Sequence, residues 1–238
     1  LYQALNGGIP VLPVFVFDKS ILDSLEKNDA RVSFIYQTLS NINIKLQEFS
    51  SSLLVLHDKP IDAFKKICAK FQVKEVFANH DYEPYAIHRD EEVETFLHSK
   101  NIFFKTYKDQ VIFEKNEVLK NDGTPYTIFT PYSRVWKEEL IKKPIVFFPS
   151  EKLSRNYYQT TPFQFPSLSE IGFHSSNISI PEINIDEIII SDYHNKRNIP
   201  SLNGTTKLSV HLRFGTVSVR QLVSIAQKKN EAWLNELI

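Results

Sequence analysis

The sequence predicts an α/β domain with a doubly wound parallel sheet, followed by the beginning of an all-α domain. Residues 11–17 read VLPVFVF, a continuous apolar run that is typical of a strand buried on both faces. Strand-like and helix-like segments then alternate, which indicates a parallel sheet with helices on its faces. Beyond residue 182 only helical signals occur, and these predict the second, helical domain.

The alternation can be followed segment by segment. In residues 31–49 the apolar positions recur in steps of three and four, which places them on one face of a helix. These positions are Val32, Ile35, Leu39, Ile42, Leu46 and Phe49. The later segments are predicted as a strand over 53–56, a helix over 61–71, a strand over 75–78, a helix over 84–100 and a strand over 103–107.

The expected topology also predicts where a ligand would bind. The crossovers between parallel strands should be right-handed, and ligands of such sheets lie beyond the carboxyl ends of the strands. At these ends the sequence places Asp18, His57, Asp58, Asn79, His80 and Asp81.

After the last of these strands the pattern changes. A turn is predicted at 121–123 and an aromatic-rich helix over 131–142, which carries Trp136. A proline-bearing stretch follows and is predicted to link two domains. We therefore expect the α/β domain over 1–142, the linker over 143–181 and the helical domain over 182–238, with helices near 185–195, 218–229 and 231–238.

The composition narrows the class of protein. Basic and acidic residues number 28 each, so the net charge does not by itself indicate a nucleic-acid-binding protein. The single cysteine, Cys68, rules out a disulfide framework and favours a reducing compartment, so we expect a cytoplasmic protein. There is no run of about 18 uncharged apolar residues, and we expect no membrane span.

Several common ligand motifs are absent. Neither G-x-G-x-x-G nor G-x-x-x-x-G-K-[ST] occurs, so an ordinary dinucleotide site or P-loop is not expected in the sheet. The histidines include no H-E-x-x-H pair and the chain has no cysteine-rich group, so no metal site is predicted. Both ends of the chain lie inside helix-like patterns and methionine is absent, from which we expect a fragment of a longer polypeptide, truncated at both ends.

Three separated segments carry the most specific motifs. They are DYEPY at 81–85 with Arg89 and Asp90 after it, YTIFTPY at 126–132, and GTTKLSVHLRFG at 204–215. By itself the first segment is the beginning of a helix, with Glu83 placed just before Pro84. In the third segment, small hydroxyl residues follow a glycine at the start of a helix. Such residues either bind an anion or simply cap the helix.

In amino-acid sequence, order and spacing, these segments resemble three separated motifs of the photolyase/cryptochrome family. The resemblance extends over essentially the whole chain. It implies an FAD cofactor, damaged DNA as partner, a monomer, and light-driven repair of cyclobutane pyrimidine dimers by electron transfer from reduced FAD, as in bacterial photolyases. One alternative is a cryptochrome-type blue-light receptor or a (6-4) photolyase. Another, of a different class, is an α/β nucleotide-binding module without flavin chemistry.

The resemblance also implies roles for individual residues. The residues expected to hold the FAD diphosphate are Thr205, Thr206, Lys207, Leu208 and Ser209, with Lys207 where the family often has arginine. Tyr193 matches a tyrosine that lies against the flavin, and Arg197 matches an arginine that contacts the phosphate backbone of damaged DNA. Each has a simpler interpretation, because Tyr193 could be a core aromatic and Arg197 a solvated charge.

A second, antenna chromophore is also implied. Family members that bind folate use an asparagine and a glutamate where this chain has Tyr85 and Ala86, so a deazaflavin or FMN is expected rather than folate. Arg31 and Glu83 are the candidates to face it, and a purely structural role for both stays equally open.

Other parts of the family's machinery are expected outside this chain. No catalytic residue is expected within residues 1–238. The family's first strand, at the centre of its sheet, is expected before Leu1, and the adenine pocket and electron-transfer tryptophans are expected after Ile238. We therefore expect Trp136 and Trp233 to pack in the core.

Overall fold

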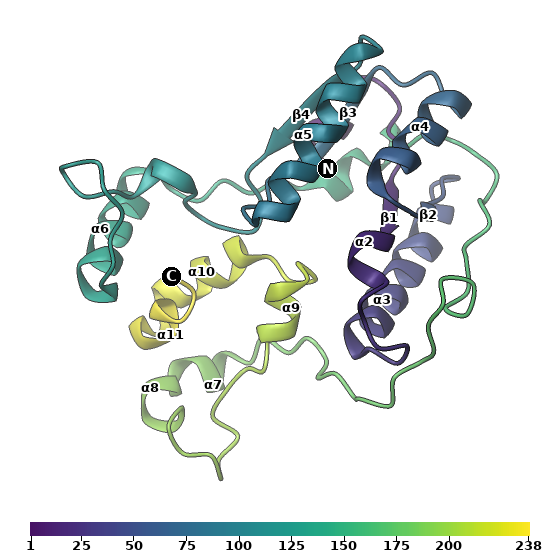
Figure 1. Ribbon diagram of the computed structural model, residues 1–238. Coiled ribbons are helices and arrows are strands. Elements are labelled where there is room, and N and C mark those ends of the chain that lie inside the picture. Colours follow the sequence, from purple (N-terminus) through teal and green to yellow (C-terminus); the bar gives the residue numbers. More distant parts are fainter. The chain divides into compact units, whose positions relative to one another are not determined.

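The computed structural model describes all 238 residues, which form two compact units (Figure 1). The first unit comprises residues 1–107 and 148–179, and the second comprises residues 108–147 and 180–238. The chain therefore leaves the first unit, returns to it, and then ends in the second. None of the helices combines the length and apolarity that crossing a membrane requires.

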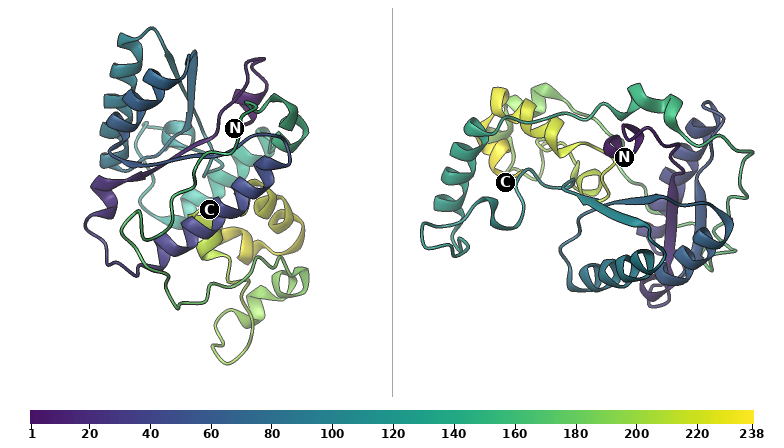
Figure 2. Two further views of the ribbon diagram at one scale, coloured as in Figure 1. Left: turned by 90° about the vertical axis from the view of Figure 1, so that its right-hand side faces the viewer. Right: turned by 90° about the horizontal axis from the view of Figure 1, so that it is seen from above.

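The first unit contains four strands in two parallel pairs. Strand β1 (Val14–Asp18) pairs with β2 (Leu54–Asp58), and β3 (Glu75–Asn79) pairs with β4 (Phe103–Tyr107). Parallel strands separated by helices confirm the α/β class. The strands form two separate two-stranded sheets, whereas the alternation predicted a single sheet, and the pairs stand apart in Figure 2.

Five helices accompany these strands, and local sequence explains where the longer ones begin. They are α1 (Tyr2–Leu5), α2 (Lys19–Leu22), α3 (Ala30–Gln47), α4 (Pro60–Lys70) and α5 (Pro84–Ser99). Asp29 caps α3 by accepting a hydrogen bond from the backbone N–H of Arg31. Pro60 and Pro84 occupy the first position of α4 and α5, where proline is favoured.

The buried face of α3 differs from the predicted one. Val32, Leu39 and Leu46 are buried as predicted, but Ile42 and Phe49 are exposed. The fourth inward position belongs to Asn43, whose side-chain oxygen accepts hydrogen bonds from the Leu53 N–H (2.9 Å) and the Ser52 hydroxyl (3.1 Å). A polar residue is tolerated at this buried position because its side chain provides a hydrogen-bond acceptor for the backbone N–H just before β2.

The segment expected to be a linker, 143–181, is largely part of the first unit. Residues 148–179 return to this unit, and Ile171 and Phe173 are each 2% exposed in the core around β1 and β2. Partly buried Phe165 packs against the same core. The proline content suggested a linker. However, burial of these apolar side chains lowers the free energy of the folded chain relative to their exposure to water.

The second unit is helical. Its α-helices are α6 (Phe129–Lys142), α7 (Glu187–Ser191), α8 (Tyr193–Lys196), α9 (Ser209–Arg213), α10 (Val219–Lys229) and α11 (Glu231–Asn235), and short 3₁₀ helices occur at Lys115–Glu117 here and Ser150–Asn156 in the first unit. Trp136 and Trp233 are 2% and 4% exposed in its core, which confirms their expected packing role. Because Trp136 packs there, α6 belongs with this unit and not with the domain expected over 1–142.

Candidate functional site

The segment 204–209 follows α8 in the second unit and runs into the first residue of α9, and it lies close to α8 at Gly204. A Cβ atom added to Gly204 would lie 2.6 Å from the Cβ of Lys196 and 2.8 Å from its carbonyl oxygen. Atoms this close must move apart, and one of the two is backbone. Glycine at this position therefore permits the approach of the segment to α8.

Two residues further along the segment fix its orientation. Lys207 has a left-handed backbone conformation, with φ of 54°, which turns the chain before α9. Leu208 is buried in the core of the second unit, in the same cluster as Leu222. The side chain of Leu208 is therefore an anchor, and only its backbone remains for contact with a ligand.

The remaining side chains of the segment carry hydrogen-bond donors. Thr205, Lys207 and Ser209 are exposed and Thr206 is half-buried. None of the three hydroxyl groups takes part in a hydrogen bond within the chain, and neither does the Lys207 ammonium. Hydroxyl donors beside a positive charge suit an anion with several oxygens, such as a diphosphate. The residues present therefore fit the FAD diphosphate expected at this segment.

The structure does not favour the simpler interpretation of this segment as a helix cap. The cap position of α9 is occupied by Leu208, and no side chain makes a capping hydrogen bond there. Ser209 is already the first helical residue. The hydroxyl groups thus remain available to a ligand.

The buried His211 supports the segment from α9, and sequence reasoning did not single it out. Its Nε2 lies 2.7 Å from the carbonyl oxygen of Pro181, and its Nδ1 lies 2.8 Å from the Thr216 hydroxyl. Because a carbonyl oxygen only accepts, Nε2 donates the hydrogen bond to Pro181. The ring therefore ties α9 to the residues that enter the second unit.

Tyr193 and Arg197 are brought together at α8. Tyr193 is half-buried against the core, and the guanidinium carbon of Arg197 lies 5.7 Å from the centre of its ring. Arg197 also forms an ion pair with Glu236, so in this structure it is not an isolated solvated charge. Burial raises the pKa of the Tyr193 hydroxyl, and the negative charge of Glu236 adds to that effect.

Helix α11 contributes polar groups that sequence reasoning also missed. The side-chain amide of Asn230 caps α11 and donates to the carbonyl oxygen of Ser191, 2.9 Å away, which joins α11 to α7. The side-chain oxygen of Asn235 is buried without a hydrogen-bond partner. A buried acceptor of this kind is uncommon and marks a place where a ligand donor could bind.

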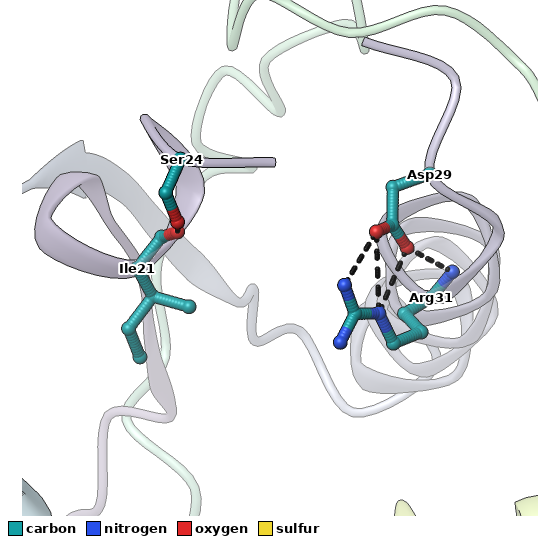
Figure 3. A network of polar contacts seen from close by, with 4 residues as sticks. All are labelled: Ile21, Ser24, Asp29 and Arg31. Atoms are coloured by element: carbon teal, nitrogen blue, oxygen red, sulfur yellow. Dashed lines mark hydrogen bonds and ion pairs between the residues drawn. The ribbon is translucent and has the colours of Figure 1, made fainter. Parts of the chain in front are cut away.

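In the first unit, the antenna candidate Arg31 is bound to the residue that caps its own helix (Figure 3). Its guanidinium Nη2 lies 2.6 Å from Asp29 Oδ2, and its Nε lies 3.0 Å from Asp29 Oδ1. This hydrogen bond lowers the pKa of the Asp29 carboxyl. The neighbouring loop is closed by Ser24, whose hydroxyl donates to the carbonyl oxygen of Ile21 (3.0 Å). In this structure the guanidinium of Arg31 is therefore paired with Asp29.

The other antenna candidate, Glu83, stands at the cap position of α5 and is exposed. Its neighbour Tyr85 reaches the end of β1, where its hydroxyl donates to the carboxylate of Asp18. Burial raises the pKa of the Tyr85 hydroxyl, and the hydrogen bond to Asp18 adds to it. Close by in the sequence, Arg89 forms an ion pair with Asp90 at 2.7 Å. Sequence reasoning placed Asp18 at a strand end but did not find its partner.

Comparison with known proteins identifies the family. Residues 1–150 match the family model described as DNA photolyase. A deoxyribodipyrimidine photo-lyase of Synechococcus is 26% identical over 227 residues, which cover 89% of this chain and 47% of that protein. The chain thus spans about half the length of this relative.

Two solved structures share the fold. The archaeal photolyase from Sulfolobus tokodaii with two FAD molecules has a TM-score of 0.70 at 22% identity, with 99% of this chain and 53% of that chain covered. The Synechocystis cryptochrome has a TM-score of 0.74 at 18% identity, with 99% and 55% covered. Because the family model covers well over half of the residues, the chain belongs to the DNA photolyase family.

Proposed function

We propose that the full-length protein binds FAD through segment 204–209 and repairs pyrimidine dimers in DNA with light. The observation that carries this proposal is the row of unused donors on the exposed side of the segment, held in place by Gly204 and Leu208. When bound and reduced, FAD supplies the excited electron that splits the dimer. In a full-length protein as long as the Synechococcus relative, residues outside this chain would form the rest of the FAD site.

The residues of this chain then have distinct tasks. Thr205, Thr206 and Ser209 donate hydrogen bonds to the diphosphate, and Lys207 neutralises part of its charge. Tyr193 lies against the flavin ring system of FAD from the side of α8. Turning a damaged nucleotide out of the DNA stack costs a few kcal/mol. This cost is lower where a lesion has already weakened base pairing, and photolyases are among the enzymes that turn out their target in this way.

Replacing Thr205 and Ser209 together by alanine is expected to lower FAD retention of the full-length protein at least tenfold. Hydrogen bonds to a charged group contribute about 1.5–3 kcal/mol each, and about 1.4 kcal/mol corresponds to a factor of ten in affinity. The flavin absorbance per protein after gel filtration measures the effect. Ser201→Ala, which removes an exposed hydroxyl from the same loop, is the control. Unchanged flavin content in the double variant would show that the diphosphate binds elsewhere.

Arg197→Ala is expected to weaken binding of damaged and undamaged DNA by similar factors. A contact to phosphate carries no sequence or lesion information, and its loss should reduce the slope of log affinity against log salt by about 1. Titration of both DNAs at several salt concentrations measures this, with Arg155→Ala in the other unit as control. A loss confined to the damaged DNA would contradict a phosphate contact.

We further propose that a second chromophore, a deazaflavin or FMN, binds at the strand ends of the first unit near Glu83. Tyr85 and Ala86 stand where folate-binding family members have an asparagine and a glutamate, which disfavours folate. The Sulfolobus photolyase contains two FAD molecules, which supports a second chromophore in addition to the first FAD. Since Arg31 is bound to Asp29, its part in this site requires that ion pair to open. Mass spectrometry of chromophores released from the full-length protein tests the assignment.

A light receptor of the cryptochrome type is the second candidate function, because a cryptochrome shares the fold. A repair assay with the full-length protein on DNA that carries either a cyclobutane dimer or a (6-4) product separates a receptor from the two kinds of photolyase. A purified protein without the flavin absorption band would instead support a nucleotide-binding module without flavin chemistry.

A further inference from the structure

Helix α9 carries a buried histidine that has no task in the function proposed above. His211 is 5% exposed and lies in the middle of the helix. Polar groups are seldom buried without hydrogen-bond partners, because an unpaired group loses its hydrogen bonds to water and gains none. The partners of His211 therefore indicate what its ring holds in place.

The two ring nitrogens of His211 join α9 to segments before and after it. Nε2 donates to the carbonyl oxygen of Pro181, 2.7 Å away and 30 residues earlier in the chain. Nδ1 lies 2.8 Å from the hydroxyl of Thr216, and the N–H of Thr216 donates to the carbonyl oxygen of His211 (3.0 Å). Gly215, with φ of 66°, supplies the left-handed turn between α9 and Thr216. The ring thus ties α9 to the chain on both sides.

Helix α9 depends on such contacts for its position. It has five residues (Figure 1), and an isolated helix of this length is not stable in water. Leu208 occupies its N-terminal cap position, and no side chain makes a capping hydrogen bond there. Leu208 is buried at the start of the helix and His211 is buried in its middle. These two side chains therefore hold α9 in the core of the second unit.

Helix geometry connects the buried ring with an exposed hydroxyl group. Ser209 is the first residue of α9, and its side chain is exposed. Successive residues are about 100° apart around the axis of an α-helix, so Ser209 and His211 point about 200° apart. Because the ring of His211 points into the core, the side chain of Ser209 lies on the opposite, solvent-facing side of α9.

Thr205 is held by other contacts. It follows Gly204, which lies against Lys196 of α8, and it precedes the left-handed residue Lys207. The position of Thr205 is thus set by the approach of the chain to α8, whereas the position of Ser209 is set by α9.

We propose that His211 is a positioning residue of the FAD diphosphate site. Its hydrogen bonds to Pro181 and Thr216 hold α9 so that the hydroxyl of Ser209 reaches the diphosphate. The inference rests on the function proposed above and adds that the donors of segment 204–209 fall into two groups. Ser209 depends on His211, and Thr205 does not.

A double-mutant cycle in the full-length protein tests this dependence. FAD affinity is measured by titrating flavin-free protein with FAD and following flavin fluorescence, for Ser209→Ala, His211→Leu and the two together. Each single substitution is expected to weaken FAD binding about tenfold. Residues that act through one another are not additive, so Ser209→Ala should weaken binding less than about threefold once His211 is replaced. In the control cycle, with Thr205→Ala in place of Ser209→Ala, the two factors should multiply.

A conservative variant separates positioning from a general loss of stability. Glutamine keeps an N–H donor for the carbonyl oxygen of Pro181, so His211→Gln is expected to bind FAD at least about threefold more tightly than His211→Leu. Urea unfolding without FAD reports the stability of each variant. If His211→Leu does not fold, Thr216→Val replaces it in both cycles, because it removes the hydroxyl that contacts Nδ1 and keeps the shape of the side chain.

The outcomes distinguish the role of His211 from the function on which it rests. Factors that multiply in the Ser209 cycle, or equal coupling in the Thr205 cycle, would overturn the positioning role and leave the diphosphate site intact. Unchanged FAD affinity in both Ser209→Ala and Thr205→Ala would overturn the diphosphate site itself, and with it the role of His211.

Discussion

Gly204→Val is expected to eliminate FAD retention by the full-length protein and to destabilise its helical unit. The added side chain would begin 2.6 Å from the Cβ of Lys196 and 2.8 Å from its carbonyl oxygen, so segment 204–209 must move away from α8. Overpacking of this kind costs about 1–3 kcal/mol. The displacement also removes the donors of Thr205 and Ser209 from their common position, so the loss of affinity should exceed that of the double alanine variant.

The effect on FAD can be separated from the effect on stability. Flavin absorbance per protein reports retention, and urea unfolding reports stability. Asn203→Ala changes the adjacent exposed residue and should leave both unchanged. If Gly204→Val retained its flavin, the close approach to α8 would not be needed for binding, and the diphosphate site would have to lie on another segment.

Trp136→Ala is expected to produce the largest loss of stability in the helical unit. The indole is 2% exposed and packs edge-on against Phe113 with ring centres 5.4 Å apart. Truncation of a buried aromatic side chain to alanine costs about 3–5 kcal/mol, because apolar burial is lost and a cavity remains. Against a total of about 5–15 kcal/mol for a domain, this is a large fraction.

The matched control lies on the same helix. Ile141 is 80% exposed, and Ile141→Ala should change the free energy of unfolding by no more than about 0.5 kcal/mol. Urea unfolding followed by circular dichroism compares the two variants. Similar midpoints for both would mean that α6 does not pack through Trp136 in solution. An altered electron-transfer rate with unchanged stability would also contradict the packing role.

Local sequence predicted the elements well because the relevant signals are local. Proline at the first position marked the start of α4 and α5, and alternation of apolar strands with helices predicted their parallel direction. The helix predicted over 31–49 is α3, and both of its ends lie within two residues of the predicted ones. Caps and periodicity depend on neighbours three or four residues away, and so the sequence contains them in full.

The candidate site was predictable to a smaller extent. The motif at 204–209 predicted a diphosphate site at this segment, which stays a prediction. The amino-acid sequence of the motif does not show that Leu208 is an anchor or that Gly204 lies against Lys196. Arg31 was a reasonable antenna candidate by position, yet its side chain is bound to Asp29. These outcomes depend on which side chains a fold brings together over long distances in sequence.

The sequence by itself determined the α/β class and the order of strands and helices, and it singled out segment 204–209 as the proposed diphosphate site. Only the tertiary structure decided that residues 148–179 rejoin the first unit, that Asn43 replaces Ile42 on the inner face of α3, and that β1 and β3 each keep an open edge. The physical reason is that burial and strand pairing are shared between distant residues. The neighbours of a residue in the sequence do not show whether that residue will contact a buried backbone group or an apolar surface from a distant part of the chain.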